Sequence, residues 1–133
     1  MREGFKLEIV NPEKSFLSKD GVLEVVVPAF EGDMGILKDH ISIISFLRPG
    51  LLRIVDSKSS EETFYVEDGI IEFKNNCLSI LTSNIFDIKK IDKNKVRDIL
   101  AEAEKESQNQ EISDEAKYLV NHKIEVLKSL TLN

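Results

Sequence analysis

The chain has 133 residues, of which 41% are hydrophobic and 32% are charged, and its formal net charge is −6. This balance is typical of a soluble globular fold and argues against disorder, and the length suits one domain or a small domain with an appendage. The charge balance leaves no basic patch, so we expect neither nucleic acid nor an anionic membrane surface as a partner. No apolar run approaches the ~20 residues that span a bilayer, so we expect no direct membrane insertion.

From Phe5 to about Leu81 the hydrophobic pattern has the period of β-strands. The stretches FKLEI (5–9) and LEVVV (23–27) alternate, so that every second side chain faces the same way. Further short apolar runs follow at close spacing: GILKDH, ISIISFL, LLRIV, TFYV, IIEF and CLSIL. Many short strands with frequent turns predict an all-β sandwich or barrel.

Turn residues separate these runs. Asp20-Gly21 and Asp68-Gly69 place a glycine where φ can be positive, and Asn75-Asn76 tolerates the left-handed region. Pro49-Gly50 fits a type II turn, in which glycine takes the positive φ that follows proline. The sequence therefore predicts a chain reversal at each of these four pairs.

Near residue 91 the period changes to that of a helix. Asp92 suits an N-cap, and a second helix can begin at Ser113, where acidic residues follow. Lys123 falls inside the apolar arc of the second helix. The apolar stripes are Val96, Ile99, Leu100 and Ala103, then Ala116, Leu119, Val120, Ile124 and Leu127. We expect a β domain over residues 1–90 and an antiparallel helical hairpin over residues 91–133.

The stretch PAFEGDMGILKDH (28–40) is the strongest candidate for a functional loop. Its carboxylates Glu31 and Asp33 are two residues apart, but acids in a glycine-containing turn are usually solvated turn formers. The loop lacks the Lys-Ser/Thr of a phosphate cradle, and its acids would repel phosphate. With one cysteine and two distant histidines, His40 and His122, we expect no catalytic group, no metal site and no cofactor.

Taken together, several segments resemble the epsilon subunit of the bacterial F-type ATP synthase. They are KLEIVNPEKSFLS (6–18), VVVPAFEGDMGILKDH (25–40), LRPG (47–50), VEDGIIEFKNNCLSILT (66–82) and IDKNKV (91–96). The likeness covers nearly the whole chain in order and spacing. It implies a two-sheet β-sandwich followed by a helical hairpin, in agreement with the two periods.

The resemblance also implies a function. The chain would be a non-enzymatic rotor subunit of a proton-translocating ATP synthase, peripheral on the cytoplasmic side of the bacterial inner membrane. Its sandwich would bind the gamma subunit and touch the membrane-embedded c-subunit ring. Its hairpin would extend toward the alpha and beta catalytic subunits and inhibit ATP hydrolysis.

The same resemblance implies which residues make these contacts. The ring and shaft interface would comprise Glu31, Gly32, Asp33, Met34, Gly35, His40 and Ser45. A two-glycine turn lets backbone approach a partner closely, and its acids favour a basic or polar one. Lys38-Asp39 replaces the Pro-Gly that is usual before the histidine in this family.

The hairpin carries two further candidate sites under the resemblance. Some family members bind ATP through a motif that corresponds here to Ile91, Asp92 and Lys95. Lysine stands where that motif has arginine, and it lacks the bidentate fork of arginine. Asp92 is sufficiently explained as a helix cap. Inhibitory contacts to acidic loops would come from basic residues of the second helix: Lys117, Lys123 and Lys128. The alternative for those lysines is an ordinary solvated face.

Without the resemblance, the alternative function is a β-sandwich that binds a small ligand or carbohydrate. Such sites usually stack sugars on exposed aromatic rings. The chain has no tryptophan and two tyrosines, Tyr65 and Tyr118. This composition disfavours the alternative.

Overall fold

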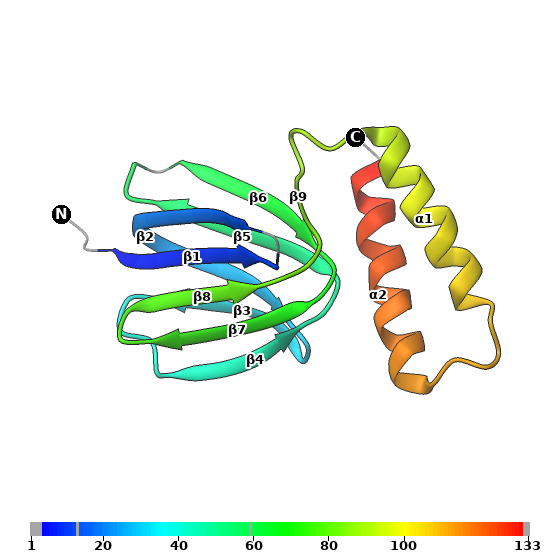
Figure 1. Cartoon of the computed structure of the whole chain (residues 1–133), viewed down its shortest axis with the longest axis horizontal. Coiled ribbons are helices and arrows are strands. Elements are labelled where there is room, and N and C mark those ends of the chain that lie inside the picture. The colour runs from blue at the N-terminus through cyan, green and yellow to red at the C-terminus, as the bar shows by residue number, and fades with distance from the viewer. Residues whose placement is uncertain (1–3, 13, 59, 132–133) are drawn as a thin grey trace.

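The computed structural model describes residues 4–12, 14–58 and 60–131. The described residues form a two-layer β-sandwich with two helices at one of its ends (Figure 1), which confirms the predicted fold class. The strands are β1 (Phe5–Asn11), β2 (Lys14–Ala29), β3 (Gly32–Leu37), β4 (Ile43–Leu47), β5 (Gly50–Asp56), β6 (Glu61–Val66), β7 (Gly69–Lys74), β8 (Cys77–Leu81) and β9 (Ile85–Asp87). The helices are α1 (Lys93–Ser107) and α2 (Asp114–Thr131).

The long strand β2 joins the two layers. The strands follow the order β1-β8-β7-β4-β2-β5-β6-β9, with β3 beside β2 and a further pairing between β1 and β2. All these pairings are antiparallel except that of β1 with β8. Because β2 has 16 residues, its first half pairs with β1 and its second half with β3 and β5.

The core lies between the layers and is made of alternating strand residues. In β1, the predicted inward set of Phe5, Leu7 and Ile9 is at most 2% exposed. The remaining buried members are Val22, Val25, Val27, Ile36, Leu47, Leu52, Ile54, Phe64, Val66, Ile71, Phe73, Leu78, Ile80 and Ile85. Burial of these side chains supplies the main driving force for the sandwich.

Two of the four predicted turns form as expected, and two do not. Asn75 and Asn76 both have positive φ between β7 and β8, and Gly69 has φ +147° at the start of β7. Gly21 does have positive φ, but it lies inside β2, where the pairing of the strand shifts from β1 to β5. The prediction at Gly50 was wrong: this residue begins β5 without positive φ, and a Cβ there would lie 2.5 Å from Cβ of Pro28. Close packing therefore explains this glycine.

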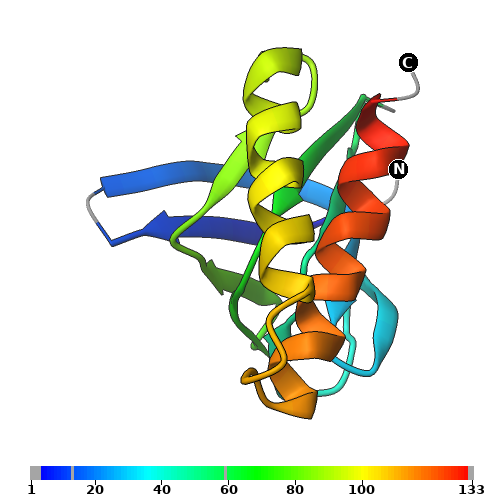
Figure 2. The same ribbon diagram turned by 90° about the vertical axis from the view of Figure 1, so that its right-hand side faces the viewer.

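The two helices run antiparallel, side by side, across the end of the sandwich (Figures 1 and 2). Asp92 caps α1 by accepting from the Asn94 amide at 2.9 Å, and Ser113 accepts from the Ala116 amide at 3.1 Å at the start of α2. A second apolar cluster attaches both helices to the sandwich; its buried members are Tyr65, Val96 and Leu127. Neither helix has the length and apolar character needed to cross a membrane.

Gly69 and Gly32 form a matched pair for testing how close packing constrains the sheet. Their φ angles are +147° and +146°, so an alanine pays a similar backbone penalty at either position. A Cβ on Gly69 would lie 2.3 Å from the Leu81 carbonyl oxygen, whereas one on Gly32 would meet no described atom within 4 Å. We expect Gly69→Ala to lower the free energy of unfolding by about 1–3 kcal/mol more than Gly32→Ala, measured by urea denaturation. Equal losses would show that backbone strain alone matters.

Candidate docking surfaces

The predicted ring-contacting residues lie on and beside the β2–β3 hairpin. Ala29 pairs with Gly32, so that Phe30 and Glu31 form a two-residue turn. Glu31 and Asp33 are exposed at this tip, and Gly35 is exposed further along β3. Met34 packs partly against the core instead. The hairpin thus presents two carboxylates on a short, backbone-rich tip.

The structure does not bring His40 to this tip. β3 separates the two, since Glu31 precedes it and His40 follows it, and six strand residues span ~20 Å. The His40 ring packs edge-on against Phe73, and its Nδ1 lies 2.7 Å from the Ile41 carbonyl oxygen. Beside it, Asp39 and Asn76 bond each other twice, at 2.7 and 2.9 Å. The predicted interface residues therefore divide between the two ends of β3.

Ser45 is half-buried in the inward-facing register of β4, together with Ile43 and Leu47. The outward positions of this strand are Ile44 and Phe46, whose side chains are 68% and 64% exposed. On this strand, Ile44 and Phe46 are therefore better placed than Ser45 to contact a partner.

A continuous row of exposed apolar side chains crosses the outer face of four strands. Phe46 pairs with Ile70, Ile70 with Leu81, and Leu81 with Val10. We call these four residues the apolar strip; their side chains are 39–64% exposed. An exposed apolar patch of this kind is a candidate contact site. The sequence analysis missed the strip, although IISF and IIEF place apolar residues on both faces of a strand, as in doubly covered sheets.

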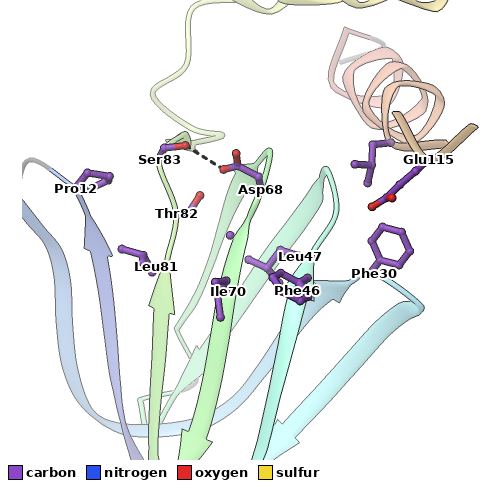
Figure 3. A pocket seen from close by; sticks show the side chains of 12 residues that line it. Pro12, Phe30, Phe46, Leu47, Asp68, Ile70, Leu81, Thr82, Ser83 and Glu115 are labelled. Atoms are coloured by element: carbon purple, nitrogen blue, oxygen red, sulfur yellow. Dashed lines mark hydrogen bonds between the residues drawn. The ribbon is translucent and has the colours of Figure 1, made fainter. Parts of the chain in front are cut away.

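The apolar strip continues into a groove of about 590 Å³ between the sandwich and the start of α2 (Figure 3). A hydrogen bond from the Ser83 hydroxyl to Asp68, at 3.0 Å, closes its polar rim. Figure 3 shows Phe30 below Glu115 at one end of the groove. The groove is lined by Pro12, Phe30, Phe46, Leu47, Asp68, Gly69, Ile70, Leu81, Thr82, Ser83, Glu115 and Leu119.

Polar contacts hold α2 onto the sandwich beside this groove. The Tyr118 hydroxyl donates to the Phe30 carbonyl oxygen at 2.8 Å and accepts from Arg48 Nη1 at 3.0 Å. Arg48 Nη1 also lies 3.2 Å from Nε2 of His122. The Tyr118 ring packs on Phe30 at 5.2 Å between centroids and on His122 at 4.5 Å. We call Phe30, Arg48, Tyr118 and His122 the helix latch.

Lys123, the lysine inside the apolar arc, has a partner on the sandwich. Its Nζ lies 3.3 Å from Oε1 of Glu67, which also accepts from the Tyr65 hydroxyl at 3.3 Å. Burial, aided by the Glu67 carboxylate, raises the pKa of the Tyr65 phenol far above its ordinary value, so this tyrosine stays a neutral donor. Lys117 and Lys128 are exposed. The three predicted inhibitory lysines are therefore in different environments while the hairpin is docked.

The residues of the doubtful nucleotide motif have structural roles here. Ile91 packs in the second apolar cluster, and Asp92 caps α1. Lys95 Nζ lies 4.6 Å from the centroid of the Phe86 ring, a cation–π contact. Together they anchor the start of the hairpin to the sandwich.

The hydroxyl of Tyr118 is the part of the helix latch that can be removed most cleanly. We expect Tyr118→Phe to keep the ring contacts but to lose both hydrogen bonds. The free energy of unfolding should fall by about 1 kcal/mol, and Tm in a thermal scan by about 3 °C. Ser129→Ala is the control, because the Ser129 hydroxyl donates to the Val126 carbonyl within α2, at 2.6 Å, and not to the sandwich as the structure describes it. If both variants melt alike, the two hydrogen bonds of the Tyr118 hydroxyl contribute nothing measurable to stability.

Comparison with known proteins identifies the family. A model of the beta-sandwich domain of the ATP synthase delta/epsilon chain matches residues 4–88. The ATP synthase epsilon chain of Pelagibacter ubique (strain HTCC1062) is 68% identical over 130 residues, which cover 98% of this chain and 99% of that one. The sodium ion specific epsilon chain of Propionigenium modestum is 36% identical over 88 residues, 66% and 63% of the two chains.

Two solved assemblies contain chains with the same fold. One is the Euglena gracilis mitochondrial ATP synthase, OSCP/F1/c-ring, with a TM-score of 0.76 over 99% of this chain and 82% of that one. The other is the central stalk/c-ring of the Tetrahymena thermophila mitochondrial ATP synthase, with a TM-score of 0.70 over 98% of both chains. Both are 20% identical, so they bear on the fold alone. By its sequence matches, the chain belongs to the ATP synthase delta/epsilon family, among the bacterial epsilon chains.

Proposed function

We propose that the chain is a non-catalytic central-stalk subunit of a proton-translocating F-type ATP synthase, peripheral on the cytoplasmic side of the bacterial inner membrane. In this proposal, residues 1–90 form the docking domain and residues 91–133 the movable hairpin. The observation that carries it is the apolar strip, an exposed row of large apolar side chains across four strands. The epsilon chains that are 68% and 36% identical to this chain support the same setting.

The apolar strip is the proposed contact for the gamma subunit. Phe46 is the largest side chain of the strip and the most exposed, at 64%, and it borders the groove beside α2. Aromatic side chains that enter a partner's pocket often dominate the binding energy of an interface. His40 and the exposed Ile44 extend this contact along β4 toward the far end of the sandwich.

The β2–β3 tip is the proposed contact for the c-subunit ring. Glu31 and Asp33 are exposed there, and Gly32 leaves space above the backbone. A short acidic tip favours a basic or polar ring loop and adds specificity more than affinity. The tip and the apolar strip both reach the helix end of the sandwich, which allows a single orientation to satisfy both partners.

The helical hairpin is the proposed brake on ATP hydrolysis. In the docked conformation Lys123 is paired with Glu67, so only undocking would present it together with Lys117 and Lys128 to acidic loops of the alpha and beta subunits. The docked hairpin is therefore the non-inhibitory state in this proposal. ATP binding is not part of it, because Asp92 and Lys95 act as a helix cap and a ring contact.

The alternative function, a carbohydrate-binding sandwich, gains no support from the tyrosines. Tyr65 is 0% exposed, and Tyr118 is packed between Phe30 and His122. Tyr65 therefore offers no face to a sugar, and Tyr118 is held by contacts within the chain.

Binding to the gamma subunit tests the apolar strip. Ile70→Ser removes an outward apolar side chain of the strip, and Arg53→Ser, an exposed change on β5 in the other layer, is the control. We expect the first change to weaken affinity for purified gamma by about tenfold or more, and the second to have little effect, in a calorimetric titration. Equal affinities for both variants would move the shaft contact away from the strip.

Hydrolysis by the catalytic head with its shaft tests the brake. The double variant Lys117→Gln/Lys128→Gln removes the two exposed cations of α2, and Lys93→Gln/Lys105→Gln removes two exposed cations of α1. We expect the first variant to bind the head but to lose most of the inhibition shown by the unmodified chain, and the second to keep it. If the unmodified chain binds without slowing hydrolysis, the hairpin is not a brake.

A further inference from the structure

The contact between Arg48 and His122 constrains the protonation state of the docked hairpin. An arginine side chain has five donors and no acceptor. At 3.2 Å from Arg48 Nη1, Nε2 of His122 must therefore present its lone pair, which requires the neutral ring. Protonation would remove this acceptor and place two cations side by side in a half-buried contact.

No free carboxylate among the described neighbours of His122 relieves the repulsion between a protonated His122 and Arg48 in the docked state. From the sandwich, Arg48 meets it directly, and the carboxylate of Glu67 is paired with Lys123. On α2, Tyr118 contacts it through its ring, and Glu125 is exposed on the same helix, so its influence persists when the hairpin undocks. From α1 the buried side chains are the apolar Val96 and Ala103, and all charged residues of that helix are exposed.

We propose that the helix latch is acid-sensitive: protonation of His122 breaks its contact with Arg48, sets two cations against each other and favours undocking of the hairpin. Histidine ordinarily titrates near pH 6.5. Docking weakens as the pH falls, because only the undocked state accepts the proton without a neighbouring arginine. Two polar contacts of the latch then remain: the bond from the Tyr118 hydroxyl to the Phe30 carbonyl, at 2.8 Å, and the bond from Arg48 to that hydroxyl, at 3.0 Å.

The acid-sensitive latch is a property of the isolated chain. Only its effect on ATP hydrolysis rests on the proposed function. Undocking would present the lysines of α2, so acidification would favour the inhibitory state and restrain ATP hydrolysis. A failure of the chain to bind the gamma subunit would remove this consequence but would leave the latch itself intact.

Thiol protection in the full chain can test the latch. In a Cys77→Ser background, Leu51→Cys places a thiol on β5 in the cluster covered by the hairpin. Its rate of reaction with an aromatic disulfide, divided by that of an unstructured cysteine peptide at each pH, rises with the undocked fraction, because the half-buried thiol becomes more exposed when the hairpin leaves. Between pH 8 and pH 5.5 we expect this corrected rate to rise several-fold, with a ceiling of about tenfold per pH unit for one proton.

Three variants complete the test. His122→Gln keeps an acceptor but cannot titrate, so the rise should vanish, whereas His40→Gln, the control at the other histidine, should retain it. If His122→Gln is undocked at every pH, the Arg48→Gln variant provides the test. The glutamine amide can donate to the neutral His122 ring or accept from the protonated one, so the rise in rate should flatten. No rise in the parent chain, or an equal rise in His122→Gln or Arg48→Gln, would overturn the proposal.

Discussion

The pairing of β2 with four other strands is the constraint on which the rest of the structure depends. β2 contacts β1 with its first half and β3, β4 and β5 with its second, so it lies beside β1 in one layer and between β3 and β5 in the other. At its end, the Pro28 carbonyl accepts from the Arg48 amide at 2.9 Å, and the Phe30 amide donates to the Phe46 carbonyl at 2.8 Å. These bonds set the positions of the acidic tip, the helix latch and the start of the apolar strip together.

Because all three depend on the end of β2, the acidic tip, the helix latch and the start of the apolar strip lie together at the helix end of the sandwich. The apolar strip needs β4, β7, β8 and β1 in register, which the β-sandwich core provides. The hairpin covers the neighbouring surface through a smaller cluster and a few polar contacts, separate from the larger core. This separation agrees with the proposed movable hairpin, whose departure would leave the larger core in place.

Sequence reasoning found the features that are local and missed those that depend on distant partners. Alternation and caps identified β1 and the start of α1, because both signals lie within a few residues. Gly21 and Gly50 were misjudged since a bend inside a strand and a contact with Pro28 are set by tertiary packing. Lys123 looked anomalous in an apolar stripe until Glu67, far away in sequence, proved to be its partner. The apolar strip appears only after four strands are aligned.

The bond from Tyr118 to the Phe30 carbonyl has a mechanical consequence. Phe30 directly precedes Glu31, so the two-residue turn at the acidic tip is braced by α2 whenever the hairpin is docked. Undocking would remove that brace and leave the tip supported by the sheet alone. The stiffness of the tip would therefore differ between the docked and the undocked state. If a rotor transmits torque through the tip, it would be stiffer when the hairpin is docked than when the hairpin is extended.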